Sequence, residues 1–296
     1  MMKFSIIIPT FNRRKMLGIC LASLINQEYP QKNFEIIVVD DGSKDETEQF
    51  MGNLAKPKNN IRYFRIEHNG QGAARNLGMK KVRGKYISFI DDDCVVKPDY
   101  LLKIERKFKQ KNIDAIGGPI INPTNKYIAW SSHLLQFSSW FPESGKRLIH
   151  NIPTANITYK TESIKGMGFN EKLGAAGYED SLFNYDFTKN GKRILFYPKI
   201  PVIHLSWEDK SSLNKFFGIQ KRTAQGFVKG GYIVQGWKGR LLFKIRFLNL
   251  LCPYLAYVFV KCLKSGYLSR FFYHLPLMIA GEFYKGLVIM TYYPRR

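Results

Sequence analysis

The first third of the chain alternates short apolar segments with amphipathic ones, and this alternation restricts the fold more than any other feature. The apolar segments are rich in Ile, Val, Phe and Tyr and are bounded by Pro, Gly, Asn or Asp, as β-strands are. We predict strands at Phe4–Ile8, Phe34–Val39, Ile61–Ile66 and Tyr86–Ile90, and helices over residues 14–27, 44–54 and 71–82. Strands joined by helices of this length form right-handed crossovers, so the pattern predicts a largely parallel sheet.

The rest of the chain gives weaker signals. We predict the following elements: a helix over 98–112, a strand at Ile113–Gly117, an irregular stretch over 118–152, a strand at 154–159, a helix over 179–190, and strands at 193–197 and 201–204. From residue 210 onward the pattern is helical, apolar and basic. The sequence therefore predicts an α/β domain over residues 1–207 and a helical extension over residues 208–296.

The net charge of +23 is unevenly distributed. Residues 205–296 carry 15 Lys and Arg against 3 Asp and Glu, whereas residues 1–204 carry 31 against 20. A basic and aromatic region indicates an anionic partner, either acidic lipid or nucleic acid, although a solvated basic face is the alternative. The apolar content of 45% excludes a disordered chain. The four cysteines show no CxxC spacing and indicate reduced thiols.

Two further features concern the membrane. The N-terminal run Phe4–Ile8 is too short for a signal peptide, and its basic residues follow it, so we interpret it as a buried strand. Residues 240–262 and 267–293 are apolar and aromatic, but the longest uncharged run, Phe247–Val260, is shorter than a spanning helix requires. This pattern favours helices lying on a membrane surface over core or subunit-packing helices. We expect a cytoplasmic protein held peripherally on the inner face of the cell membrane.

Polar clusters follow three of the first four predicted strands, at residues 9–13, 40–43 and 91–93. Open parallel sheets bind ligands at the carboxyl ends of their strands, so these clusters predict a ligand site. Residues 91–93 are three consecutive aspartates, whose mutual repulsion and desolvation require a cation nearby. A hard divalent ion meets that need, and a solvent-exposed acidic turn is the alternative. In an extended segment Asp91 and Asp93 would share one face.

Five segments, in this order, resemble the family 2 glycosyltransferases: SIIIPTFNR, EIIVVDDGSKDET, GAARNLGM, YISFIDDDC and GYED. Together they span about residues 3–204. The resemblance implies an inverting transferase with the GT-A fold, a Rossmann-like and mostly parallel sheet flanked by helices. It also implies that the domain over 1–207 is catalytic, with a nucleotide-binding half over about 1–117 and an acceptor half over about 118–207.

The resemblance assigns several residues to the nucleotide. Pro9, Thr10 and Phe11 match positions that cradle the nucleoside, although Phe11 could equally belong to the core. Asp41 matches the position that accepts a hydrogen bond from the base, and a carboxylate suits the N3–H of uracil or thymine. Arg75 lies in the third nucleotide-contacting segment, where it can pair with the aspartates or with phosphate, or simply begin a helix.

The resemblance also implies a metal site at the aspartates. Asp93 is the expected direct ligand of Mg²⁺ or Mn²⁺, which neutralises charge developing on the leaving diphosphate. Asp91 is a second candidate ligand, and Asp91 or Asp92 would otherwise contact the ribose or a metal-bound water. His204 matches a position that can complete the metal shell, although a single His is more often an ordinary structural residue.

The general base is expected at the start of the helix over 179–190. The resemblance gives this role to Asp180, with Glu179 as the alternative, whereas acids that merely favour the helix dipole are common there. The base would take the proton of the acceptor hydroxyl as its oxygen attacks the anomeric carbon. Gln220 and Arg222 match the motif of processive relatives only faintly, so processive synthesis is not expected.

These residues predict transfer of a sugar from a nucleotide-diphosphate sugar, a UDP-sugar, to a saccharide or lipid-linked acceptor in cell-surface glycan synthesis. Polyprenyl phosphate itself is an alternative acceptor. A sugar nucleotidyltransferase would need a Gly-rich phosphate loop after the first strand, where this chain has PTFNR. A non-catalytic basic protein that binds membrane or nucleic acid has no use for the acidic clusters, so we expect no nucleic-acid partner.

Overall fold

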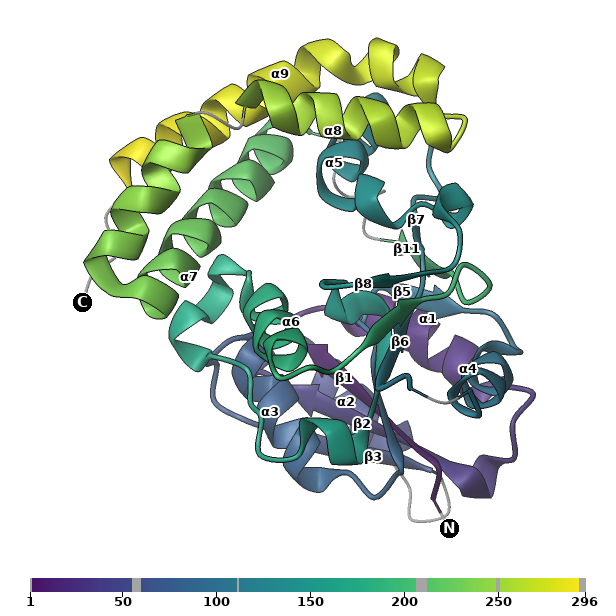
Figure 1. The fold of residues 1–296 in the computed structure, drawn as a ribbon. Helices are drawn as coiled ribbons and strands as arrows, with labels where there is room; N and C mark the ends of the chain where they lie inside the picture. The colour runs from purple at the N-terminus through teal and green to yellow at the C-terminus, as the bar shows by residue number, and fades with distance from the viewer. Residues whose placement is uncertain (1, 55–59, 111, 206–211, 249–250, 293–296) are drawn as a thin grey trace. The chain divides into compact units, whose positions relative to one another are not determined.

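The structure, a computed structural model, describes residues 2–54, 60–110, 112–205, 212–248 and 251–292 (Figure 1). The chain divides into two compact units. The sheet unit takes residues 1–121, 145–174 and 180–205. The helical unit takes residues 122–144, 175–179 and 206–296, so it includes two segments that lie before the predicted extension.

The sheet unit is built on parallel strands that the sequence predicted. β1 (Phe4–Thr10), β2 (Phe34–Asp40), β3 (Ile61–Arg65) and β4 (Tyr86–Phe89) pair in the order β3-β2-β1-β4. Every residue of β1 and β2 is buried, as expected for parallel strands covered on both faces. Because neighbouring strands run the same way, the carboxyl ends of β1, β2 and β4 meet at one edge of the sheet.

The remaining strands complete a mixed sheet and form a second, smaller one. β9 (Ile157–Lys160) lies antiparallel between β4 and β6 (Ala115–Gly117), and β10 (Ile194–Phe196) joins β6 to the edge strand β8 (Arg147–Ile149). The second sheet has the order β5-β11-β7, with β5 at Cys94–Val96, β11 at Val202–His204 and β7 at Ile120–Ile121.

Helices connect the strands as the sequence predicted. They are α1 (Arg14–Ile25), α2 (Thr47–Leu54), α3 (Gln71–Lys81), α4 (Tyr100–Phe108) and α6 (Glu179–Lys189). α1 buries Leu17, Cys20, Leu21 and Leu24, the apolar residues at helical spacing. The mostly parallel α/β fold flanked by helices is therefore confirmed.

The helical unit contains α5 (Tyr127–Phe137), α7 (Leu213–Leu248), α8 (Leu251–Lys264) and α9 (Leu268–Thr291). The prediction of an irregular stretch over 118–152 is wrong, because α5 lies within it. No side chain caps the start of α5, and the helix buries polar residues such as Ser132, so its sequence lacks the usual helix signals. The apolar segment predicted over 240–262 is divided between α7 and α8.

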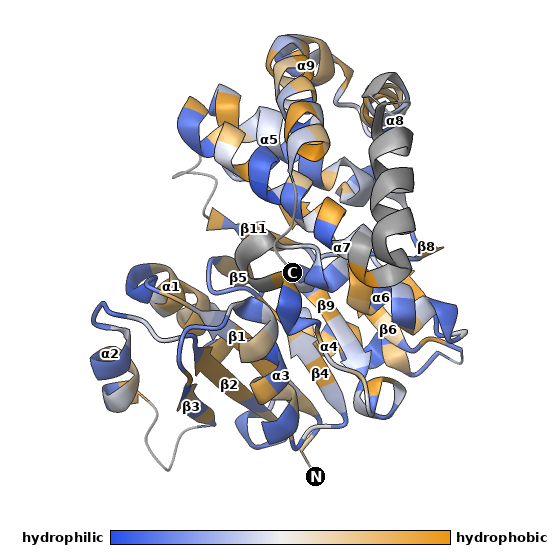
Figure 2. Cartoon of the chain, turned by 90° about the vertical axis from the view of Figure 1, so that its left-hand side faces the viewer, coloured by the Kyte–Doolittle hydropathy of each residue, from blue (hydrophilic) through white to orange (hydrophobic). Residues whose placement is uncertain are grey.

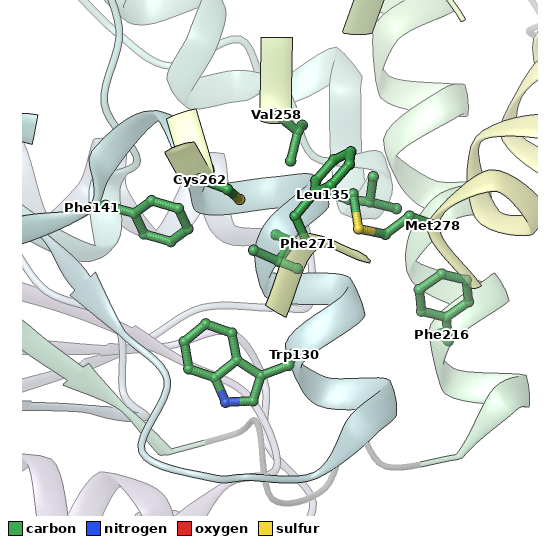
Figure 3. Close-up of a cluster of buried hydrophobic side chains, with 9 residues drawn as sticks. Trp130, Leu135, Phe141, Phe216, Val258, Cys262, Phe271 and Met278 are labelled. Atoms are coloured by element: carbon green, nitrogen blue, oxygen red, sulfur yellow. The ribbon is translucent and has the colours of Figure 1, made fainter. Parts of the chain in front are cut away.

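Buried apolar side chains from all four of these helices form one core in the helical unit. Figure 3 shows Trp130 and Leu135 of α5, Phe216 of α7, and Phe271 and Met278 of α9 converging on it. The long C-terminal helices therefore have a packed interior of their own. Among the residues that the structure describes, none of the helices combines the length and apolarity needed to cross a membrane.

His274 of α9 is only 3% exposed, and its Nδ1 lies 3.1 Å from the hydroxyl of Ser131 in α5. Its ring stacks on Tyr127, with ring centroids 4.7 Å apart. Burial, together with the smaller effect of the positive charge of Arg270, lowers the pKa of His274 to about 4. The unfolded chain therefore binds more protons than the folded one between about pH 4 and pH 6.5.

The helical unit is thus expected to lose stability as the pH falls through this window. At pH 5 the loss attributable to His274 is about 2 kcal/mol relative to pH 7.5, because the unfolded imidazole is protonated and the folded one is not. Urea unfolding of the wild type and of His274→Gln at pH 5 and pH 7.5 measures this change in the free energy of unfolding. The variant should show a smaller pH dependence by that amount, whereas His150→Gln, at an exposed position, should behave like the wild type.

Candidate functional site

The carboxylate of Asp41 follows β2 and is held by the backbone that precedes α3. Its Oδ1 accepts the N–H groups of Asn69 at 2.8 Å and Gly70 at 3.2 Å, and its Oδ2 accepts Gly70 N–H at 3.0 Å. Gly70 has φ of +91°, a conformation that glycine adopts readily and other residues do not. The loop therefore aims two amides at one buried carboxylate and fixes its orientation.

Phe11 and His68 form an aromatic pair beside Asp41. Their rings stack with centroids 4.1 Å apart and planes 18° apart, and His68 Nδ1 lies 2.8 Å from Asp41 Oδ2. Phe11 is 36% exposed, so its interpretation as a core residue is wrong. His68, which was not among the predicted site residues, lies in the loop between the third strand and the helix that carries Arg75.

Neighbouring residues support this loop. Asp40 is fully buried and accepts hydrogen bonds from the backbone N–H of Ser43 at 2.8 Å and the hydroxyl of Tyr63 at 2.7 Å. Asp40 therefore holds the loop that positions Asp41. Pro9 is buried within β1 opposite Val39, and Thr10 is paired with Asp40 in the sheet.

The three aspartates lie in a turn between β4 and β5, closed by a hydrogen bond of 3.0 Å from Cys94 N–H to the carbonyl oxygen of Asp91. The expectation that Asp91 and Asp93 share one face is wrong, because the segment is not extended. Asp91 instead accepts a hydrogen bond of 3.0 Å from Arg75 Nη2. Arg75 is 1% exposed and is thus a buried partner of the acidic cluster, as the sequence allowed.

Asp92 and Asp93 share the guanidinium of Arg13, whose Nη1 lies 3.1 Å from Asp92 Oδ1 and 2.8 Å from Asp93 Oδ2. Thr10 also donates its hydroxyl to Asp92 at 2.7 Å. Burial raises the pKa of Asp92 to about 7, with the charge of Asp93 adding to the rise and Arg13 opposing it. Both aspartates are buried, so the alternative of a solvent-exposed acidic turn is wrong. Arg13 belongs to the predicted cluster at residues 9–13, but no role was predicted for its side chain.

Asp93, Cys94 and His204 bring their ligand atoms within 4.8 Å of one another. The antiparallel pairing of β11 with β5 places His204 opposite Cys94, and His204 Nε2 lies 3.5 Å from Asp93 Oδ1. Burial, reinforced by the aspartates, raises the pKa of the Cys94 thiol well above its usual range, so Cys94 is a weak ligand. A carboxylate and an imidazole fit a divalent ion such as Mn²⁺. Asp91 lies outside this group and faces Arg75.

The candidate bases begin α6. Asp180 Oδ1 accepts the backbone N–H of Ser181 at 2.7 Å, and Asp180 is half-buried whereas Glu179 is buried. Just before them, Gly177 and Tyr178 have φ of +75° and +78°. A left-handed tyrosine is strained, and such strain occurs often at functional sites. The base role of Asp180 or Glu179 stays a prediction.

The model of the family described as "Glycosyl transferase family 2" matches residues 5–170 of this chain, more than half of its length. Together with the α/β sheet and the acidic strand ends, this match places the protein in the class of glycosyltransferases. The chain belongs to glycosyl transferase family 2.

Two curated relatives illustrate the range of the family. The poly(ribitol-phosphate) beta-N-acetylglucosaminyltransferase TarS of Staphylococcus aureus is 30% identical over 201 residues, which make up 66% of this chain but 34% of TarS. The chain thus spans about a third of that relative. A dolichyl N-acetyl-alpha-D-glucosaminyl phosphate 3-beta-D-2,3-diacetamido-2,3-dideoxy-beta-D-glucuronosyltransferase of Methanococcus voltae is 28% identical, over 83% of this chain and 79% of that enzyme.

Solved structures show the same fold. The mannosyltransferase PcManGT of Pyrobaculum calidifontis, in complex with GDP-Man and Mn²⁺, superposes with a TM-score of 0.64 at 16% identity. The match covers 98% of this chain and 87% of PcManGT. Residues 1–349 of TarS, in complex with UDP-GlcNAc, superpose with a TM-score of 0.55 at 19% identity, over 95% of this chain and 90% of that one.

Proposed function

We propose that this protein is an inverting glycosyltransferase that moves a sugar from a UDP-sugar to a saccharide or lipid-linked acceptor in cell-surface glycan synthesis. The observation that carries the proposal is a charged group at the carboxyl ends of the strands, in which the buried Asp92, Asp93 and His204 lie beside the exposed guanidinium of Arg13. This arrangement gathers the charges that a nucleoside diphosphate and its divalent ion require.

The donor would lie along the strand ends. Phe11 offers an exposed ring for the base, Asp41 offers a fixed acceptor, and Thr10 and Pro9 border the ribose. A bound Mg²⁺ or Mn²⁺ would supply the positive charge that stabilises the leaving diphosphate. Asp93 and His204 would hold this ion, and Arg13 and Arg75 would orient the carboxylates around it.

Asp180 would act on the acceptor, with Glu179 as the alternative. An inverting displacement needs one base to take the proton of the acceptor hydroxyl while the oxygen attacks from the face opposite the diphosphate. A carboxylate at the start of α6 suits this role, because the backbone N–H of Ser181 keeps one of its oxygens oriented. The second oxygen would receive the proton.

The family relatives support an acceptor that belongs to the cell surface. TarS is named for poly(ribitol-phosphate), and the Methanococcus voltae enzyme is named for a dolichyl-linked sugar. A saccharide on an anionic polymer or on a lipid carrier is therefore the proposed acceptor, and polyprenyl phosphate itself is the alternative.

A screen of nucleotide sugars tests the proposal. The protein is incubated with Mn²⁺ and UDP-, GDP- or dTDP-sugars, with and without lipid-linked saccharide or polyprenyl phosphate, and release of the nucleoside diphosphate is measured. We expect turnover with a UDP-sugar that chelation of the metal abolishes. Absence of turnover with every donor and acceptor, or turnover that chelation leaves unchanged, would contradict it.

We further propose that the helical unit rests on an anionic membrane surface, on the inner face of the cell membrane. Exposed apolar side chains recur in α9 at Phe272, Ile279, Phe283, Leu287 and Met290, whose helical spacing places them on one face. Figure 2 shows that hydrophobic and hydrophilic residues alternate along the ribbon of α9. The last turn of α8 adds Lys261 and Lys264 close to the start of α9. An apolar stripe beside basic residues suits a bilayer interface with acidic headgroups.

Replacing three of these side chains should release the protein from vesicles. The triple variant Phe272→Ser, Phe283→Ser, Leu287→Ser is expected to bind vesicles of phosphatidylglycerol about a hundredfold more weakly, because each half-exposed side chain contributes about 1 kcal/mol when it inserts. Co-sedimentation measures the partition coefficient.

The matched control changes three exposed apolar residues of the sheet unit, Ile19→Ser, Leu148→Ser and Tyr185→Ser, and should bind like the wild type. If the α9 variant bound vesicles as tightly as the wild type, the membrane proposal would be contradicted. If that variant instead turned a dimer into a monomer without affecting vesicle binding, the stripe would be an interface between copies of the chain.

A further inference from the structure

The contacts of Asp41 leave little room for a base. A carboxylate has about four lone-pair sites, and here they accept Asn69 N–H, Gly70 N–H on both oxygens, and the Nδ1 of His68. Since Asp41 would receive the base N–H in the proposed function, one of these donors must leave when a nucleotide binds.

His68 is the donor that can leave. The N–H groups of Asn69 and Gly70 belong to the backbone that begins α3, and moving them would disturb the start of that helix. The side chain of His68 is 53% exposed and can rotate into solvent without moving the backbone.

The imidazole ring of His68 also shares two features with a nucleobase. Its Nδ1 approaches two oxygen acceptors, Asp41 Oδ2 at 2.8 Å and the Asp41 carbonyl oxygen at 3.1 Å, so Nδ1 carries a proton and donates it. Its flat ring stacks on Phe11 with centroids 4.1 Å apart. A uracil with an N3–H donor would make the same two contacts, a hydrogen bond to Asp41 and a stack on Phe11.

We propose that His68 is an internal ligand of the nucleoside site, which occupies the place of the base in the free protein and is displaced by the nucleotide. This inference rests on the proposed function. His68 therefore sets the affinity for the donor and for the released nucleoside diphosphate: the protein binds nucleotide only in the fraction of molecules whose imidazole has left. Removing the imidazole should therefore strengthen nucleotide binding. An aromatic side chain that contributed to the nucleotide site would have the opposite effect when removed.

The test compares the dissociation constants of UDP, with Mn²⁺ present, for the wild type and two variants by isothermal titration calorimetry. His68→Ala is expected to bind UDP about tenfold more tightly. His68→Phe keeps a ring for stacking but cannot donate to Asp41, so its affinity should lie between the other two. Pyrophosphate, which has no base, should bind all three proteins equally.

A second measurement uses the free protein. Nitrogen-15 NMR of the imidazole should show a protonated Nδ1 whose signal shifts when UDP is added. An unprotonated Nδ1 at neutral pH, or UDP binding that is unchanged or weaker in His68→Ala, would overturn the inference and leave the proposed function standing. Failure of the wild type and both variants to bind UDP would contradict the proposed function, and the inference with it.

Discussion

Asp93→Asn is expected to lower the rate of sugar transfer about a thousandfold or more. Asp93 contacts both Arg13 and His204. Its Oδ2 accepts a hydrogen bond from Arg13 Nη1 at 2.8 Å, and its Oδ1 lies 3.5 Å from His204 Nε2. The amide keeps the shape of the side chain but carries no charge to hold a divalent ion. Loss of about 4 kcal/mol of transition-state stabilisation corresponds to the expected factor.

Steady-state kinetics with the wild type's UDP-sugar measures the effect, and electron paramagnetic resonance of Mn²⁺ gives a readout independent of turnover. The variant should bind Mn²⁺ far more weakly than the wild type while unfolding at a similar temperature. Asp186→Asn makes the same chemical change at an exposed position of α6 and should leave both quantities unaltered. A variant with normal Mn²⁺ affinity would show that Asp93 is not a ligand.

Asp180→Asn is expected to lower kcat about a thousandfold while leaving UDP binding unchanged. A general base contributes roughly two to four orders of magnitude to the rate, and an amide cannot take up the proton of the acceptor hydroxyl. Asn can still accept the N–H of Ser181 through its side-chain oxygen, so the start of α6 should remain intact. Kinetics with saturating acceptor gives kcat, and calorimetry gives the affinity for UDP.

Glu179→Gln is the matched comparison, because the two carboxylates are adjacent and either could serve. We expect it to lower kcat less than tenfold. The reverse order of effects would assign the base to Glu179 instead. Equal and small effects of both substitutions would exclude the start of α6 as the source of the base.

Most of the parallel sheet could be predicted, because its strands are continuous apolar segments with clear boundaries. β1 and β2 each extend beyond their predicted ends by one or two residues. α5 could not be predicted, since it follows two prolines and places serines and a histidine in its interior. Its burial comes from packing with α7 and α9, which no local pattern reveals.

The candidate site could be predicted in outline but not in its pairings. The polar residues at three strand ends indicated where ligands bind. The conformation of the turn at residues 91–93, which the sequence does not reveal, determines that Asp91 pairs with Arg75 and Asp92 with Arg13. Arg13 and His68 were missed because each is a common residue in a loop, and its significance comes only from a partner distant in sequence.

The pairing of β5 with β11 joins residues about 110 positions apart, and it brings His204 beside Asp93. A nascent or partly unfolded chain could carry all the acidic residues and still have no imidazole near them. Binding of Mn²⁺ would therefore require that β11 has paired with β5. The bound ion would in turn stabilise the folded domain against unfolding. Loading of the cofactor would thus depend on a long-range strand pairing and not on the acidic residues alone.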